Sequence, residues 1–305
     1  MASTLYVIDL MPFVHAGHVN KRSFLHRVED IGSRAREVRT YTGGTSLIFN
    51  TLYDIVGTGD IVICSDRRPT IKQEMLPEYK ATRDHNPEIT AERKAAEYIL
   101  QKCNATVLAY SGYEADDIIY TITRKLHDMY DEIYIYTGDS DLFFLVDDKV
   151  TIRPSNSRGK LVTRENYEKT KVHGNYYRYN SITMSKICGG DASDNIPSLP
   201  GDVWEEFSEH MFAEPLYPHM GNKETVSYWV SQLCPKALGQ VNLVFPLDVP
   251  DVPLEFTDID LHAVRNWGNA INNKIFRGSG DKSFDVAPYV EEMQVKLGIY
   301  SEEDF

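Results

Sequence analysis

The chain has 305 residues, of which 42% are apolar and 25% are charged, and its formal net charge is −13. This composition is typical of a globular protein with one large domain or a core with an appended lobe. No run of about 18 apolar residues occurs, which excludes a transmembrane helix. Asp9 interrupts the first apolar run and no basic region precedes it, which predicts a strand rather than a signal peptide. Four scattered cysteines without a CxxC pair favour a reduced, intracellular protein and argue against a zinc cluster.

At face value the net charge argues against a nucleic-acid partner, because nucleic-acid-binding proteins usually present a basic surface. The charge is unevenly placed, however. Residues 1–200 carry 25 basic and 27 acidic side chains, whereas residues 201–305 carry 7 basic and 18 acidic ones. Most of the acidity therefore belongs to the last third, and the first two thirds require a separate interpretation.

Short apolar runs and helical patterns alternate over the first 140 residues. Runs of the kind found in strands buried on both faces cover residues 5–9, 60–66, 106–109 and 132–139. Helical periodicity covers residues 45–56, 89–103 and 114–129. Thr90 is the expected N-cap of the second helix. The alternation predicts an α/β fold with a mainly parallel central sheet flanked by helices, in which ligands bind at the carboxyl ends of the strands.

After about residue 180 the pattern changes, because prolines interrupt the helical segments and no further parallel strand is indicated. We therefore expect a core over residues 1–180 and a smaller helical lobe over residues 181–305. The lobe is expected to end in an acidic segment that starts near residue 279.

Nine acidic residues stand at the ends of predicted strands or in tight groups. They are Asp9, Asp66, Glu114, Asp116, Asp117, Asp139, Asp141, Asp191 and Asp194. Several carboxylates that converge on one site repel one another unless cations are present. Oxygen-only clusters suit Mg²⁺ or Mn²⁺, and two such ions about 4 Å apart are the usual machinery of phosphodiester hydrolysis.

Each acid taken alone has a simpler explanation. An aspartate at a strand end is more often a turn or cap residue, and Asp116 and Asp117 could be the solvated first turn of a helix. The two glycines before Asp191 are more informative, since they indicate a tight backbone close to a ligand. The functional hypothesis depends on the whole set in this order.

Basic residues follow Asp66 in a segment broken by prolines. They are Arg67, Arg68, Lys72, Lys80 and Arg83. Cations beside a metal site can hold a phosphodiester, and Tyr79 could stack on a base. Any one of these residues could equally belong to an ordinary solvated face. A second basic stretch covers residues 21–39, and without the nine acids residues 1–200 would carry a net charge of +7.

These motifs together resemble the 5′ nuclease family, which includes the flap endonucleases, the 5′–3′ exonuclease domain of bacterial DNA polymerase I and the bacteriophage exonuclease/ribonuclease H enzymes. The resemblance covers residues 4–270 and is greatest to the stand-alone bacteriophage enzymes. The motifs that carry it, in order, are VID at 7–9, the strand that ends at Asp66, LPEYKATRD at 76–84, GYEADDI at 112–118, TGDSDL at 137–142, GDASDNIPSLPG at 190–201 and NLVFPLDVPDVPLEF at 242–256.

The resemblance implies a PIN-like core with a helical arch near residues 67–103 and two Mg²⁺ or Mn²⁺ ions. On the matching positions, the first ion would be held by Asp9, Asp66, Glu114 and Asp116. The second would be held by Asp139, Asp141, Asp191 and Asp194, with Asp117 nearby or acting through water. Lys80 and Arg83 would contact the scissile phosphate, and Tyr79 would stack on the frayed terminal base.

The implied activity is that of a 5′–3′ exonuclease and structure-specific 5′ flap endonuclease with ribonuclease H activity, which removes primers and flaps in DNA replication. Its substrates would be DNA with a 5′ flap, a nick or an RNA primer, and RNA–DNA hybrids. A single-strand binding protein or another replisome component could be a partner, and no membrane partner is expected. The implied location is the bacterial cytoplasm, including that of a phage-infected cell.

One family motif is missing. After SDNIPSLPG the family usually continues with a glycine-rich helix–hairpin–helix turn that grips one duplex strand and often binds K⁺. Here residues 202–206 read DVWEE, without the glycines and the lysine of that turn, so the region near residues 187–240 is a degenerate version of it and lacks the basis for a K⁺ site. Lys223 and Lys236 are candidate substitutes for the duplex contact.

Three other functions fit parts of the pattern. A haloacid dehalogenase-type phosphatase shares the early aspartate and the late GDxxD. Its nucleophile motif also requires an acid two residues after the first, and Met11 occupies that position here. A non-catalytic replisome module with the same fold would have lost metal ligands, whereas all nine acids are present. A PIN-type ribonuclease toxin is usually much shorter. Metal-dependent hydrolysis would separate the nuclease from the binding module.

Overall fold

The structure is a computed structural model. It describes residues 3–20, 24–31, 34–83, 86–155, 159–166, 171–172, 175–176, 183, 186–187, 189–199, 201, 223–233, 235–272 and 284–293. Within these ranges, no helix is long and apolar enough to cross a membrane.

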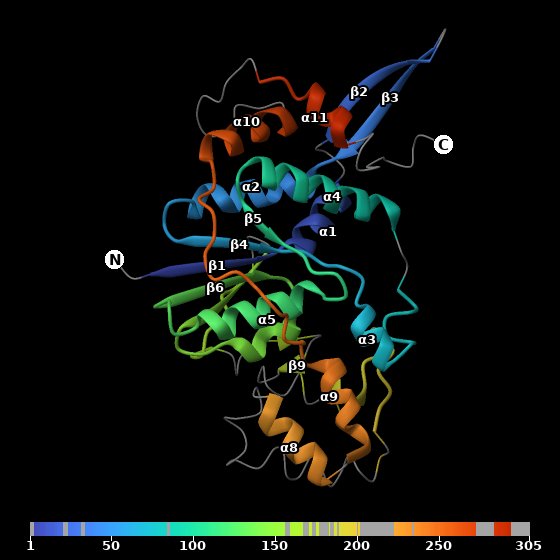
Figure 1. Ribbon diagram of the computed structural model, residues 1–305, viewed down its shortest axis with the longest axis vertical. Helices are drawn as coiled ribbons and strands as arrows, with labels where there is room; N and C mark the ends of the chain where they lie inside the picture. Colours follow the sequence, from blue (N-terminus) through green and yellow to red (C-terminus); the bar gives the residue numbers. More distant parts are fainter. Residues whose placement is uncertain are drawn as a thin grey trace. The chain divides into compact units, whose positions relative to one another are not determined.

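The largest sheet has five strands in the order β5-β4-β1-β6-β7 (Figure 1). The strands are β1 (Thr4–Asp9), β4 (Asp60–Cys64), β5 (Thr106–Leu108), β6 (Glu132–Thr137) and β7 (Val150–Pro154). β1 pairs in parallel with β4, β4 with β5, and β6 with β7. The predicted α/β class and the four predicted strands are confirmed, whereas β7 was not predicted.

The helices flank this sheet, as the α/β class requires. In chain order they are α1 (Leu10–Asn20), α2 (Gly43–Ile55), α3 (Thr70–Met75), α4 (Pro87–Lys102), α5 (Ala115–Leu126), η1 (Ser140–Leu145, a 3₁₀ helix), α8 (Lys223–Leu233), η4 (Pro235–Ala237, also 3₁₀), α9 (Leu238–Val244), α10 (Leu261–Asn272) and α11 (Ala287–Glu291). Two small antiparallel pairs complete the described elements: β2 (Phe24–Ile31) with β3 (Arg34–Tyr41), and β8 (Lys171–Val172) with β9 (Asn175–Tyr176).

The three predicted helices correspond to α2, α4 and α5, but the predicted cap of α4 was wrong. The Asn86 side chain, not Thr90, accepts hydrogen bonds from Glu88 N at 2.9 Å and Ile89 N at 3.4 Å. Pro87 follows at the first helical position, where its missing N–H leaves no bond unmade. The helix therefore begins at Pro87, two residues before the predicted helical pattern.

The chain divides into two compact units, each discontinuous in sequence. The first unit comprises residues 66–84 and 109–252 with residues 1–2, and the second comprises residues 3–65, 85–108 and 253–305. This grouping differs from the single boundary predicted at residue 180. In the second unit the Trp267 ring lies 5.4 Å from that of Phe284 and 5.2 Å from that of Tyr289, so this part of the C-terminal segment packs within the unit that contains β1.

In the second unit, α1 and α2 flank the β2–β3 hairpin in sequence and pack against each other. Their backbones approach so closely that a Cβ atom on Gly17 would lie 2.0 Å from Gly44 N. The buried carboxylate of Glu92, on α4, accepts a hydrogen bond from Gly44 N at 2.8 Å and lies 3.2 Å from His18 Nδ1. Glu92 thereby connects the helix before the hairpin, α1, to the helix after it, α2.

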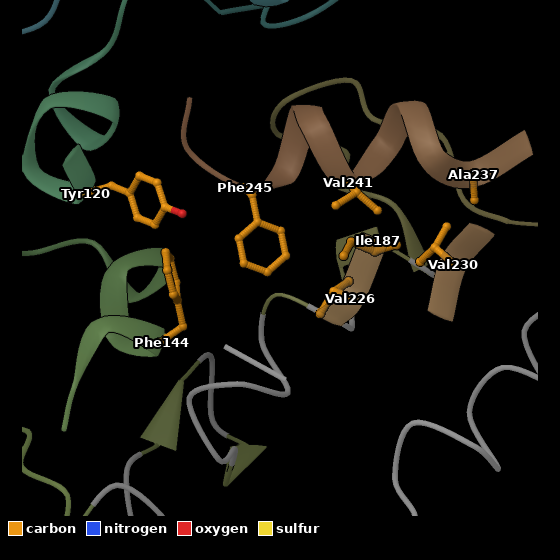
Figure 2. Close-up of a cluster of buried hydrophobic side chains, with 8 residues drawn as sticks. All are labelled: Tyr120, Phe144, Ile187, Val226, Val230, Ala237, Val241 and Phe245. Carbon is orange, nitrogen blue, oxygen red and sulfur yellow. The ribbon is translucent and has the colours of Figure 1, made fainter. Parts of the chain in front are cut away.

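The core of the first unit joins α5 to the helices near the end of that unit. Figure 2 shows Tyr120 of α5, Phe144 of η1 and Phe245 grouped at one end of an apolar cluster. The Phe144 ring lies 6.0 Å from that of Tyr120 and 5.4 Å from that of Phe245. The remaining buried members of the cluster are Ile187, Val226, Val230, Ala237 and Val241. The cluster anchors the segment just before the GDASDNIP motif to α8 and α9.

The close approach of α1 and α2 yields a stability prediction. Gly17→Ala should lower the free energy of unfolding by about 1–3 kcal/mol, because the new methyl group would overlap backbone atoms that cannot move aside cheaply. Gly239→Ala, in α9 with no atom within 4 Å of the added Cβ, should be neutral or stabilise by up to about 1 kcal/mol. Urea unfolding midpoints measure both, and equal midpoints for the two variants would contradict the packing argument.

Candidate functional site

The N-terminus of α5 gathers acidic side chains of the GYEADDI motif. The backbone N–H of Glu114 donates to Asp117 Oδ2 at 2.9 Å, and that of Ala115 donates to Asp66 Oδ1 at 2.6 Å. Carboxylates are stabilised there because the first N–H groups of a helix lack partners and carry partial positive charge. Asp66, two residues beyond β4, is thereby drawn to this helix end.

Glu114 is buried, and protein donors occupy both of its carboxylate oxygens. Oε2 accepts hydrogen bonds from Lys72 Nζ at 3.0 Å and from the Tyr79 hydroxyl at 2.9 Å, while Oε1 accepts one from Lys80 Nζ. Burial alone would raise the pKa of Glu114, but the charges of Lys72 and Lys80 outweigh it and lower the pKa to about 2. The carboxylate is therefore ionised at neutral pH.

Asp117 has a different role from its neighbours. Its side chain is fully buried, and its Oδ1 accepts a hydrogen bond from Leu247 N at 2.7 Å while its Oδ2 is bonded to the α5 N-terminus. One turn later, Thr121 Oγ1 accepts a hydrogen bond from Val249 N at 2.9 Å. Asp117 and Thr121 thus fasten the NLVFPLDVP segment to α5. Backbone amides use both Asp117 oxygens, and its predicted place near a metal, or its action through water, stays a prediction.

The LPEYKATRD turn docks onto the GDASDNIP loop, more than 100 residues away in the sequence. Lys80 N donates to Asp194 O at 3.1 Å, and the Thr82 hydroxyl lies 2.7 Å from Asn195 Oδ1. Arg83 contacts the Asp194 carboxylate at 2.5 Å. Lys80 and Asn195 both have positive φ, 54° and 60°, a conformation that non-glycine residues adopt at a cost and that clusters at functional sites.

A glycine shapes the acidic loop itself. Gly190 has φ 73°, and a Cβ atom there would lie 2.5 Å from Ile196 O. The loop closes on itself next to that glycine, because Asp191 N and Ile196 O are 2.9 Å apart and Ile196 N and Asp191 O are also 2.9 Å apart. The second glycine of GGDASDNIP is therefore required by the backbone path that presents Asp191.

A second acidic group contains Asp139, Asp141 and Asp191. Asp139, just after β6, accepts a hydrogen bond from Asp141 N at 2.8 Å. Lys186 Nζ bonds to Asp141 and lies 2.6 Å from Asp191 Oδ2. Burial and the charges of Asp139 and Asp191 raise the pKa of Asp141, against the effect of Lys186. Burial also opposes ionisation of Asp191, but hydrogen bonds from Lys186 and Ser193 lower its pKa to about 2.

The donors of this second group fit a divalent cation better than those around Glu114. Its carboxylates repel one another, and two of them already share one positive charge, that of Lys186. Around Glu114 three protein donors occupy the oxygens instead. Among the described residues, no group of three or more acidic, histidine or cysteine side chains has the geometry of a metal-binding site.

The predicted site residues distribute between the two units. Eight of the nine acids belong to the first unit, and Asp9 belongs to the second, where its carboxylate accepts a hydrogen bond from Met11 N at 3.2 Å. Lys186, which contacts two of the predicted ligands, was not predicted. No spacing rule marks a lysine five residues before an aspartate, so only the folded chain identifies it.

Two predicted nucleic-acid contacts differ from the structure. Lys72 and Tyr79 are only 3% and 2% exposed and contact Glu114, whereas the prediction placed them against a phosphate and a base. Arg67 and Arg68 reach the surface, and Arg83 remains half exposed.

The proposed substitutes for the missing hairpin turn also have structural constraints. Lys223 Nζ donates to Pro246 O at 3.3 Å, and burial lowers the pKa of Lys223. Residues 202–206 and the Lys236 side chain lie outside the described part of the chain.

Comparison with known proteins places the chain in a family through its first part. Residues 4–176 match the family model described as 5′-3′ exonuclease, N-terminal resolvase-like domain. The chain is 32% identical over 135 residues to DNA polymerase I of Chloroflexus aurantiacus, and 32% identical over 161 residues to a 5′-3′ exonuclease of Mycoplasmopsis pulmonis. These matches cover 43% and 51% of this chain, but only 14% of the polymerase and 52% of the exonuclease.

A solved structure shares the fold. The zinc-bound T5 5′-exonuclease superimposes with a TM-score of 0.52 over 79% of this chain and 90% of its own, at 20% sequence identity. The match supports the PIN-like nuclease architecture that the strand order indicates.

The buried ion pairs of Glu114 predict a pH-dependent stability. Glu114→Gln should lower the free energy of unfolding at pH 7 by about 3 kcal/mol, since the folded pKa lies near 2 against an ordinary value of 4.5. Because the folded-state pKa is depressed, this stabilisation is complete above the ordinary value and is lost as the pH falls towards 2. Urea unfolding in EDTA from pH 7 to pH 2.5 measures it.

The exposed Glu78, in the same turn as Tyr79, supplies the control. Glu78→Gln should unfold like the wild type at every pH. A stability difference for Glu114→Gln that stays constant down to pH 2.5 would contradict the assigned ion pairs.

Proposed function

The chain belongs to the 5′-3′ exonuclease family, and from this premise we propose that it is a metal-dependent 5′–3′ exonuclease and 5′ flap endonuclease. The observation that carries the proposal is the pairing of Asp141 and Asp191 with one positive charge, that of Lys186, next to Asp139. The loop that carries Asp191 also binds the Lys80–Arg83 turn through Asp194. The carboxylates are suitable ligands for a hard cation such as Mg²⁺, and the nearby Lys80 and Arg83 side chains can bind a phosphate.

In this proposal Asp139, Asp141 and Asp191 hold one Mg²⁺ or Mn²⁺ ion, and Asp66, Glu114 and Asp116 contribute to a second. Bound ions of this kind lower the pKa of an attacking water and stabilise the charge that develops on the phosphorus. Asp117 and Asp194 have supporting roles: the first fastens the backbone to α5, and the second orients Arg83.

Lys80 and Arg83 bind the scissile phosphate. Both are paired with carboxylates, Lys80 with Glu114 and Arg83 with Asp194. Arg83 presents five donors in a planar fork, and its side chain is 54% exposed, so it can donate a hydrogen bond to a phosphate oxygen while it stays bonded to Asp194. Lys80 is more enclosed, at 14% exposed, and is suited to neutralise charge close to the reacting bond.

The finer parts of the proposal follow the family resemblance. They are cleavage near 5′ ends with 5′-phosphate products, activity on DNA flaps, nicks and RNA–DNA hybrids, and primer and flap removal in replication with a single-strand binding protein or another replisome component as a partner. End-labelled flap, nicked and RNA-primed duplexes, incubated with Mg²⁺ and sized, would establish which of these substrates is cut.

A non-catalytic binding module is the second candidate, because protein cations already neutralise four of the predicted ligands. These are Glu114, Asp141, Asp191 and Asp194. A module of this kind would bind flap DNA without hydrolysing it under any metal condition.

Asp139→Ala should abolish cleavage of a 5′ flap while its affinity for the same DNA in Ca²⁺ stays within about threefold of the wild type, because it removes a metal ligand rather than a phosphate contact. Single-turnover cleavage in Mg²⁺ and fluorescence anisotropy measure the two quantities. Asp128→Ala, at a side chain that is fully exposed beyond α5, is the matched control and should cleave normally. Normal turnover by Asp139→Ala would refute the site.

A further inference from the structure

Lys186 occupies a position that the proposed reaction does not use. Its ammonium bonds to Asp141 Oδ2 and lies 2.6 Å from Asp191 Oδ2, so one positive charge bridges two carboxylates from separate segments. The neighbouring Ile187 is fully buried in the apolar cluster of Figure 2, which fixes the backbone that carries the lysine. Lys186 is therefore held next to the acids rather than meeting them by chance.

This bridge differs from an ordinary surface ion pair. The side chains of Lys186, Asp141 and Asp191 are 25%, 31% and 10% exposed, so water screens them only in part. Asp139 adds a third negative charge, because its carboxylate holds the backbone N–H of Asp141. Without a cation, three carboxylates at this spacing repel one another, and Lys186 is the cation that the described chain supplies.

A divalent ion and this ammonium would require the same oxygens. Mg²⁺ binds carboxylate oxygens at about 2.1 Å and demands nearly octahedral geometry. An ion held by Asp141 and Asp191 would lie close to Nζ if the lysine stayed, and two cations at such a distance repel strongly in a partly dry site. The lysine must therefore swing away when the ion binds.

We propose that Lys186 is a built-in counter-ion that holds Asp141 and Asp191 together in the metal-free protein and competes with the divalent ion for them. This inference rests on the proposed function, because it assumes that Asp141 and Asp191 are metal ligands. Lys186 is a positioning residue: it stabilises the empty site against charge repulsion and sets the metal concentration at which the site fills.

The test is Mn²⁺ binding to the full chain, measured by calorimetry and by the electron paramagnetic resonance signal of free Mn²⁺. Lys186→Met keeps the length of the side chain but removes its charge, and should bind Mn²⁺ about tenfold more tightly, a typical size for coupling between two binding events. In EDTA the variant should melt at a lower temperature than the wild type. Saturating Mn²⁺ should raise the Tm of the variant by more than it raises the Tm of the wild type. Lys186→Arg should restore wild-type affinity.

Lys149→Met is the matched control. The Lys149 ammonium donates to two backbone carbonyls, those of His127 and Tyr130, at 3.0 and 3.1 Å. Its loss should lower the Tm but leave the affinity for Mn²⁺ unchanged. Lys186→Gln provides a second neutral variant if Lys186→Met does not fold, as judged by circular dichroism.

The outcomes separate the inference from the proposed function. If the wild type binds Mn²⁺ and the neutral variants bind it equally or more weakly, Lys186 does not compete and the inference fails alone. If the wild type neither binds Mn²⁺ nor cleaves flap DNA, the proposed function fails and the inference fails with it.

Discussion

The buried carboxylate of Glu114 connects the parts of the first unit. It accepts bonds from Lys72, Tyr79 and Lys80, which belong to one segment, and it begins α5, which belongs to another. A charge taken out of water is costly unless its partners are well placed, and removing one partner of a buried pair is more costly still. The segment around α3 and the LPEYKATRD turn is therefore held firmly against α5.

The N-terminal part of α5 also binds other segments of the first unit. Asp117 and Thr121 hold the backbone at Leu247 and Val249, and this segment follows α9, whose Val241 lies in the apolar cluster. Meanwhile the LPEYKATRD turn holds the GDASDNIP loop by backbone and side-chain bonds. Positive and negative side chains thus neutralise one another inside the unit, which lowers the repulsion among its carboxylates.

The sequence predicted the sheet and three helices correctly because their apolar runs are long enough to show a period. It missed β7, and it placed the cap of α4 at Thr90, because capping depends on Asn86 with Pro87 rather than on the apolar stripe. The linear boundary at residue 180 could not reveal that the segment with Trp267 returns to the second unit, since periodicity carries no information on which core a helix joins.

The candidate site divides in the same way. Sequence alone determined which acids stand near one another in the chain, and the glycine before Asp191 signalled a backbone that other residues could not follow. Only the tertiary structure decided which partners these side chains have. Asp117 anchors a backbone segment, Tyr79 and Lys72 are buried partners of Glu114, and Lys186, from outside the motifs, pairs with the second group. The reason is physical. Spacing fixes which residues are neighbours along one segment, whereas ionisation and hydrogen bonding depend on burial and on charges that other segments bring.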